Sequence, residues 1–210
     1  MAVRIEHDFP LFLADTVVLP SEITGLNVFE DRYKALVAHC LEDGSEFGLV
    51  WLSRSGLHRV GCACVIEEVL EQGDDDRFNI IIQGTKPFTL IEREERHPYP
   101  AGAVEFLEDR SEQEDETTAG AAHESFMELL ETATNSTPQL EDLDEMSAYE
   151  MAATVDFGPD AKQGLLDLRS ENARMRFVTR LFHLAAKRLE QIAEAHEIAA
   201  TNGKIKFHQQ

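Results

Sequence analysis

Cys62 and Cys64 are two thiols whose spacing would allow them to bind a metal ion together. On an extended strand their side chains point to the same side, and His58 joins them if the strand continues, while Cys40 is a third thiol. A structural zinc ion needs four Cys or His ligands that converge tetrahedrally, and a C-x-C pair with a distant third cysteine is not specific to zinc. Free cysteines are commonly buried as small apolar residues. We therefore expect the cysteines to lie in the core and the chain to bind no cofactor. An enzymatic metal site would require stoichiometric zinc in elemental analysis.

Sequence patterns of nucleotide and peptide-bond chemistry are not found in the chain. There is no G-x-x-x-x-G-K-[ST] segment to hold nucleotide phosphates. The eight histidines are scattered and form no H-E-x-x-H pattern, and the sequence has no recognisable Ser-His-Asp pattern. We therefore expect no catalytic residues and a chain that is not an enzyme.

Charge and composition limit the class of partner. Forty acidic residues against nineteen basic ones give a formal charge of -21, which repels phosphate backbones and anionic lipid. Twelve Phe and 43% hydrophobic residues indicate a globular chain, no apolar run reaches the length of a membrane span, and the N-terminus lacks the apolar core of a signal peptide. Three cysteines without a framework spacing are typical of reduced thiols. We expect a cytoplasmic protein with no membrane partner.

The chemistry-bearing residues lie in a segment, residues 6–107, whose patterns predict strands and one helix at residues 31–41. Residues 73–76 read as a hairpin turn, and Ile80 and Ile82 alternate with polar residues as in a sheet with one wetted face. Many short strands suggest a closed or nearly closed sheet. The candidate strands are residues 9–12, 16–19, 26–29, 47–52, 57–70, 77–83, 88–92 and 103–107.

A candidate recognition feature lies at the change from strand to helix, at Phe29, Glu30, Arg32 and Tyr33. In the structural interpretation, which we favour, Phe29 and Tyr33 are core, Glu30 satisfies N–H groups of the turn or helix start, and Arg32 pairs with a carboxylate. In the functional interpretation Glu30 and Arg32 form an exposed surface for a partner. Asp31 suits the first helical turn, so the helix should begin there.

A second candidate is an apolar groove for an extended peptide. Trp51 and Leu52, with the loop of residues 53–56, are suited to line it, as is Tyr99 between two prolines. An extended chain offers backbone hydrogen bonds and alternating side chains, so a sheet edge beside apolar pockets would bind it. Ordinary core packing explains the same residues equally well, and the sequence leaves both interpretations open.

The second half of the chain is helical after an acidic run at residues 108–118. Ser147 and Glu150 form a capping box, a short helix is expected at residues 162–168, and a long helix at residues 171–200. The apolar residues of the long helix follow a heptad pattern. We favour the interpretation that this face packs in a small bundle, and a homodimeric coiled coil is the alternative. This heptad seam consists of Met175, Val178, Phe182, Ala185, Leu189, Ile192 and His196.

Several short motifs in a fixed order resemble a known family. They are Pro10-Leu11-Phe12, Val18-Leu19-Pro20, Leu26 with Val28-Phe29-Glu30, Arg32-Tyr33, Val60-Gly61 with Ala63, Gly84 with Phe88, and Pro98-Tyr99 with Ala101, Val104 and Glu105. Their spacing resembles the amino-terminal, substrate-binding domain of Lon proteases. Beyond residue 146 the likeness rests on Gln163-Gly164-Leu165-Leu166-Asp167, a partial match to a motif before the family's long helix. The chain departs from the family pattern at Ser21, Gly25, Asp31 and Cys62.

The resemblance implies an α+β fold, in which a PUA-like β pseudo-barrel with one inserted helix is followed by a C-terminal helical bundle ending in a long helix. The expected domains are residues 1–108 for the β domain, 109–118 for an acidic linker and 119–210 for the helical domain. The ATPase and peptidase modules of a full Lon protease have no counterpart in the 210 residues. A stand-alone member is therefore expected, and the alternative is an amino-terminal fragment of a longer enzyme.

The function implied by the resemblance is non-catalytic protein binding. The partners would be misfolded or apolar protein segments, or a protease or chaperone. An alternative is RNA binding, because other PUA-like barrels bind RNA, and the local cluster of Arg93, Arg96 and His97 keeps it open against the acidic net charge. The candidate protein-binding residues are Phe29, Glu30, Arg32, Tyr33, Trp51 and Tyr99.

Overall fold

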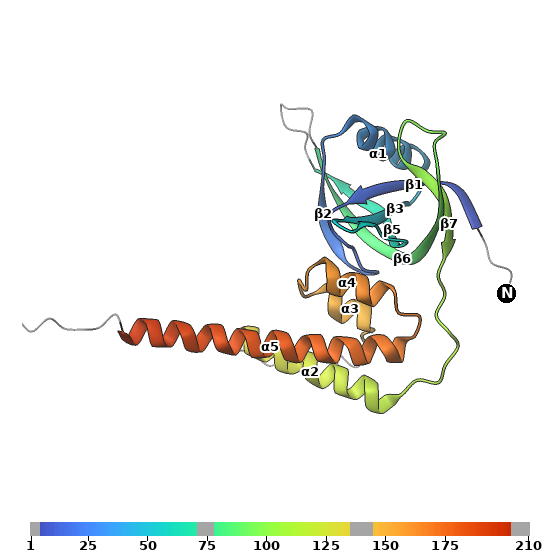
Figure 1. Ribbon diagram of the computed structural model, residues 1–210. Helices are drawn as coiled ribbons and strands as arrows, with labels where there is room; N and C mark the ends of the chain where they lie inside the picture. The colour runs from blue at the N-terminus through green and yellow to red at the C-terminus, as the bar shows by residue number, and fades with distance from the viewer. Residues whose placement is uncertain (1–4, 71–77, 135–144, 203–210) are drawn as a thin grey trace, which may run out of the picture. The chain divides into compact units, whose positions relative to one another are not determined.

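The computed structural model describes residues 5–70, 78–134 and 145–202 (Figure 1). Its strands form a single mixed sheet whose order is β1-β7-β6-β5-β3-β4, with β2 paired to β6. A parallel pairing between β1 and β3 joins the two sides of this order, so five strands close into a ring. The strands are β1 Ile5–Ala14, β2 Ile23–Val28, β3 Phe47–Ser53, β4 Gly56–Leu57, β5 Val60–Val69, β6 Phe78–Glu94 and β7 Ala101–Phe106.

Five helices accompany the sheet within the described ranges, and the fold is α+β as expected. That the closed sheet is of the PUA-like type stays a prediction. No helix in the described ranges combines the length and apolar character needed to cross a membrane. The helices are α1 Asp31–Asp43, α2 Glu116–Thr134, α3 Ala148–Ala153, α4 Pro159–Leu166 and α5 Glu171–Asn202.

The chain divides into two compact units. The first comprises residues 1–113 and 147–174, and the second comprises residues 114–146 and 175–210. This grouping differs from the expected division, which placed residues 119–210 in one helical domain, because α3 and α4 belong with the sheet. The predicted domain boundaries stay a prediction.

In the first unit both faces of several strands are buried, which explains their continuous apolar runs. Neighbouring β1 residues belong to different core clusters: Phe12 packs with α1, whereas Leu11 packs with Phe88. The Phe88 ring packs directly against the backbone of Gly48 and Gly61. A Cβ atom would lie 2.5 Å from Phe88 Cζ at Gly48 and 2.8 Å from it at Gly61, so only glycine fits at these two positions. Helix α1 covers one end of the ring of strands, and α3 and α4 lie at the other end (Figure 1).

Three predicted features of the sheet are wrong. The single strand predicted at residues 57–70 is divided into β4 and β5, because the register with β3 shifts between the Leu52–Leu57 pair and the Leu49–Cys62 pair. Residues 16–19 are not a strand, because the Leu19 N–H is taken by the Glu22 carboxylate at 2.9 Å in a tight turn. Ser21, where the family pattern has glycine, has φ +66° in this turn. The separate strands at residues 77–83 and 88–92 are one strand, β6, which passes through Pro87 by a bulge opposite β5. The predicted hairpin turn at residues 73–76 lies outside the described residues.

The second unit packs α2 against the part of α5 that follows Arg174. Phe126 and Phe182 meet with ring centroids 5.0 Å apart, and His123 Nε2 lies 3.0 Å from the Met146 carbonyl oxygen. The predicted seam is buried at Met175, Val178 and Phe182, while Ile192 and His196 are exposed. The seam thus packs inside the unit over its first turns only.

Candidate functional site

A pocket of about 500 Å³ opens beside Trp51, the only tryptophan of the chain. Asp15 lines it immediately after β1, the hairpin between β3 and β4 provides Trp51 and Arg54, and the start of α4 provides Asp160. Three separate stretches of the chain therefore meet at this pocket, and His58, just after β4, also lines it. All belong to the first compact unit.

The indole of Trp51 is held in one orientation by its neighbours. The imidazole of His58 stacks on it with centroids 4.3 Å apart and an interplanar angle of 16°. The backbone N–H of His58 donates to the Trp51 carbonyl oxygen at 2.9 Å, and its Nε2 lies 3.2 Å from Ser53 Oγ. A preorganised aromatic side chain loses little conformational entropy on binding a partner. The lining of the pocket therefore contains an aromatic ring of fixed orientation.

Ser53 and His58 have the separation of a nucleophile and its base, but the surrounding contacts indicate a turn. Ser53 Oγ accepts the N–H of Ser55 at 3.2 Å and donates to the Gly56 carbonyl oxygen at 3.0 Å. A serine hydroxyl that bonds to backbone groups two and three residues ahead is typical of a turn-stabilising serine. The contacts of Ser53 and His58 therefore stabilise the hairpin and orient the indole.

Three charged groups line the pocket without a charged partner. Asp15, Arg54 and Asp160 form no ion pair with any residue that the structure describes. Leu52 adds an apolar side chain that is 49% exposed. The pocket therefore combines a rigid aromatic wall, an exposed aliphatic group and uncompensated charges.

At the junction between β2 and α1 the predicted residues separate into exposed and buried ones. Tyr33 is buried, stacks on Phe12 with centroids 3.9 Å apart, and donates its hydroxyl to the Leu13 carbonyl oxygen at 3.1 Å. Arg32 pairs with Glu30 at 2.8 Å and lies over the Tyr33 ring.

Phe29 is 58% exposed, whereas the structural interpretation placed it in the core. The reason is that β2 ends at Val28, so the next side chain points away from the core. The Glu30 side chain makes no capping hydrogen bond, and its carbonyl oxygen instead accepts the N–H groups of Tyr33 and Lys34.

Tyr99 does not line the Trp51 pocket. It is 6% exposed and lies between two imidazoles, with centroid distances of 5.4 Å to His39 and 5.1 Å to His97. The six candidate binding residues are therefore not brought together, and only Trp51 lines this pocket. Asp15, Pro159 and Asp160 were missed, because nothing in the sequence indicates that the end of β1 meets the start of α4.

All three cysteines are free and buried. Contact with the Cys62 thiol, together with burial, raises the pKa of the Cys64 thiol, and burial raises the pKa of Cys40. Since the thiolate is the form that binds metal, these thiols behave as core residues. Within the described ranges no group of three or more His, Cys, Asp or Glu side chains is placed to hold a metal ion.

The basic cluster that kept RNA binding open is partly neutralised. His97 Nε2 and Arg96 Nη1 lie 3.2 and 3.7 Å from the Asp8 carboxylate. Asp8 is held at φ +56° in a bulge of β1, where its N–H donates to Glu94 at 2.8 Å. These contacts form a local charge network rather than the basic stripe that phosphate binding requires.

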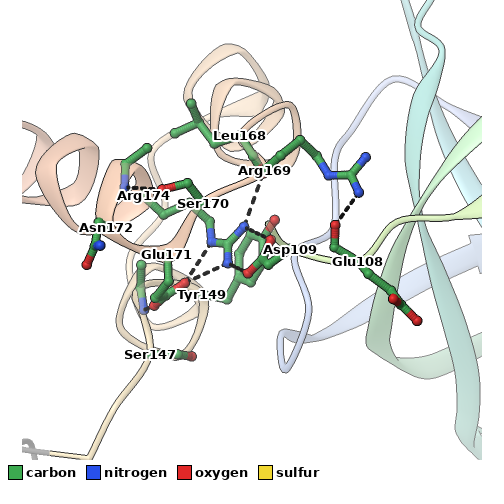
Figure 2. A network of polar contacts seen from close by, with 12 residues as sticks. Glu108, Asp109, Ser147, Tyr149, Leu168, Arg169, Ser170, Glu171, Asn172 and Arg174 are labelled. Carbon is green, nitrogen blue, oxygen red and sulfur yellow. Dashed lines mark hydrogen bonds and ion pairs between the residues drawn. The ribbon is translucent and has the colours of Figure 1, made fainter. Parts of the chain in front are cut away.

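A second polar network joins the segment after β7 to the start of α5. Figure 2 shows the Arg174 guanidinium between the carboxylates of Asp109 and Glu171 and above the ring of Tyr149. Arg174 Nη1 also donates to the Leu168 carbonyl oxygen at 3.1 Å. Because these groups satisfy one another, the network is structural.

The same network predicts an alkaline instability. Burial raises the pKa of Tyr149 to about 12, against the opposing charge of Arg174. The folded state therefore keeps a proton that the unfolded chain releases near pH 10. The resulting stabilisation is fully present below pH 10 and is lost as the pH rises to about 12, up to roughly 3 kcal/mol at 1.36 kcal/mol per pKa unit.

Urea unfolding of wild type and Tyr149→Phe at pH 9 and pH 11 measures this effect. We expect the variant to lose about 1 kcal/mol less than wild type between these pH values. The hydroxyl of Tyr149 donates to the Leu165 carbonyl oxygen at 3.3 Å, so the variant starts from a lower stability. Comparing the changes with pH removes that offset, and equal losses in the two proteins would contradict the prediction.

Comparison with known proteins gives a consistent result. The substrate-binding domain of ATP-dependent protease La (LON) matches residues 9–183. Lon protease of Anaeromyxobacter dehalogenans strain 2CP-C is 25% identical over 188 residues, and Lon protease 2 of Myxococcus xanthus is 24% identical over 189. Each alignment covers 81% of this chain, but the chain spans only 22% and 23% of these two relatives.

Two solved structures share the fold. The Lon N-terminal domain protein from Xanthomonas campestris has a TM-score of 0.64 and 25% identity, and covers 80% of this chain and 94% of its own. The N-terminal domain of the Mycobacterium avium complex Lon protease has a TM-score of 0.64 at 14% identity, with coverages of 83% and 97%. Since the family match extends over most of the sequence and the folds agree, the chain belongs to the LON substrate-binding domain family.

Proposed function

We infer that this chain is a non-catalytic module that binds extended, apolar segments of other proteins, with the Trp51 pocket as its contact site. The observation that carries the proposal is the pocket itself, in which a fixed indole lies beside the exposed Leu52 side chain. Family membership supports a role in substrate recognition, because the family is named for substrate binding. Partners from the same class are a protease or a chaperone that presents such a segment.

The sheet edge beside the pocket supports an extended partner. β4 is the last strand in the sheet order, and among the described strands it pairs only with β3. One edge of the hairpin is therefore available for backbone hydrogen bonds to an added strand, next to the Trp51 and Leu52 side chains. Backbone bonds would supply affinity for any sequence, and the pocket would select one side chain.

The emission of Trp51 tests the proposal directly, because the chain has no other tryptophan. The probe is a tryptophan-free peptide of about twelve residues in which Leu and Phe alternate with Ser and Gln. We expect a saturable shift of the emission and none with a peptide in which Ser replaces Leu and Phe. Burial of the indole under the peptide is the physical cause.

A variant pair assigns the binding to the pocket. Calorimetry with Trp51→Ala should give an affinity roughly tenfold weaker, since a buried aromatic anchor commonly contributes more than 1 kcal/mol. Phe29→Ala is the matched control, because Phe29 is an exposed aromatic residue outside the pocket. If Phe29→Ala loses the affinity and Trp51→Ala keeps it, the junction between β2 and α1 is the contact site instead. If no Leu and Phe peptide binds, the proposed function is wrong.

Two further expectations remain predictions. The cytoplasmic location rests on the composition of the chain. Assembly of two copies through α5 rests on its heptad pattern, and the exposed Leu184 and Ile192 side chains support it.

A further inference from the structure

The inference concerns which side chain the Trp51 pocket selects, and it rests on the proposed function. Asp15 and Asp160 contribute carboxylates to the pocket from two different elements. Arg54 is the only lysine or arginine in the lining, so the pocket is net negative when His58 is neutral. None of these three charges is paired with a described residue. The lining therefore leaves a negative charge for a ligand to neutralise.

The aromatic wall favours the same kind of ligand. Among aromatic side chains, the tryptophan ring attracts a cation most strongly. The methylene groups of lysine and arginine pack well on apolar surface while their charged ends stay near solvent. Trp51 and Pro159 offer that surface in the pocket whose lining also carries Asp15 and Asp160.

The charge of the whole chain acts in the same direction. A net charge of -21 creates a field that attracts cationic segments and repels acidic ones during association. A purely aliphatic side chain would leave the two pocket carboxylates partly desolvated and unpaired, which opposes its binding. An acidic side chain would add repulsion to that cost.

We propose that the Trp51 pocket accepts a lysine or arginine side chain, so that the chain selects extended segments in which basic residues alternate with apolar ones. The alkyl part of the side chain packs on the indole and Pro159. Its charged end lies between the carboxylates of Asp15 and Asp160. Apolar residues on either side of it contact Leu52 and the hairpin edge.

Three tryptophan-free peptides test the proposal. They share the alternating Leu and Phe pattern and differ only at a central residue, which is Lys, Gln or Glu. Titration of the full 210-residue chain, followed by Trp51 emission, should give affinities in the order Lys, Gln, Glu. We expect the Lys peptide to bind roughly fivefold more tightly than the Gln peptide, and this ratio to fall in 0.5 M salt.

Charge-removing variants separate the pocket from the general field. In Asp15→Asn with Asp160→Asn, the ratio of Lys to Gln affinity should fall close to one. Glu67→Gln with Glu68→Gln is the matched control, because it removes the same charge at two exposed β5 carboxylates outside the pocket. In the control the ratio should stay near fivefold. Circular dichroism confirms that both double variants are folded.

Each contrary outcome has a distinct meaning. Equal affinities for the three peptides would overturn the selection of basic residues and leave the proposed function standing. A Lys preference that both double variants keep would overturn the pocket assignment, because the general field would then explain it. No binding of any of the three peptides would overturn both the inference and the proposed function.

Discussion

Replacing Lys162 with alanine is expected to lower the free energy of unfolding by about 3–5 kcal/mol. Lys162 Nζ lies 2.5 Å from Glu22 Oε1, and the two side chains are 11% and 8% exposed. The second oxygen of Glu22 accepts the N–H of Leu19 at 2.9 Å, so the carboxylate stays where it is when the lysine is removed. The cost arises because a buried negative charge loses its counter-charge.

Urea denaturation of wild type and Lys162→Ala measures this loss. Lys34→Ala is the matched control, since Lys34 pairs with Asp31 at 3.4 Å and these side chains are 26% and 99% exposed. Removing that surface pair should cost less than about 1 kcal/mol. Glu22→Gln combined with Lys162→Met should recover much of the stability, because it removes both charges together. Similar losses in Lys162→Ala and Lys34→Ala would contradict the prediction.

The same ion pair also supports the candidate site. Lys162 belongs to α4, whose first residues, Pro159 and Asp160, line the Trp51 pocket. Gln163 provides a second attachment of α4, through a hydrogen bond from its Nε2 to the Val60 carbonyl oxygen at 3.1 Å. Together these contacts hold the start of α4 against the sheet.

Replacing Gly84 with alanine is expected to cost about 3 kcal/mol or more. An added Cβ would lie 2.1 Å from the Leu19 carbonyl oxygen and 2.9 Å from its carbon. These are backbone atoms, and the surrounding turn is tied by hydrogen bonds from Ser21 N to Gly84 O and from Gly84 N to Glu22 O. The clash can be relieved only by moving β6 away from this turn, which breaks those bonds.

Gly25→Ala is the control for this substitution. Gly25 lies in β2, where an added Cβ meets nothing within 4 Å and the φ angle is not positive. There the methyl group should change the stability by no more than about 1 kcal/mol, with stabilisation expected because the unfolded chain loses freedom. Chemical denaturation of both variants provides the comparison. A Gly84→Ala protein as stable as Gly25→Ala would show that the turn is not rigid.

Features set by neighbouring residues could be predicted from the sequence. The capping box at the start of α3 is present, with Ser147 accepting the N–H of Glu150 and the Glu150 carboxylate accepting the N–H of Ser147. The start of α1 at Asp31 and the long helix α5 also agree with the expectation. Such signals act over three or four residues, so they need no knowledge of the rest of the chain.

Exposure and strand continuity could not be predicted in the same way. Phe29 has an apolar side chain of the kind usually found in the core, but it follows the last residue of β2 and is exposed. Two strands were expected at residues 77–83 and 88–92, yet β6 continues through Pro87 because a bulge relieves its pairing with β5. Both outcomes depend on which other element of the folded chain lies next to the residue.

The sequence by itself determined the family of this chain, its α+β class and the local start of its helices, because each depends on the order of short motifs or on contacts between near neighbours. Only the tertiary structure decided which of the candidate residues share a site. Trp51 acquires Asp15 and Asp160 as neighbours through the parallel pairing of β1 with β3 and the attachment of α4 to the sheet. These contacts join residues far apart in the sequence, and no local pattern specifies them.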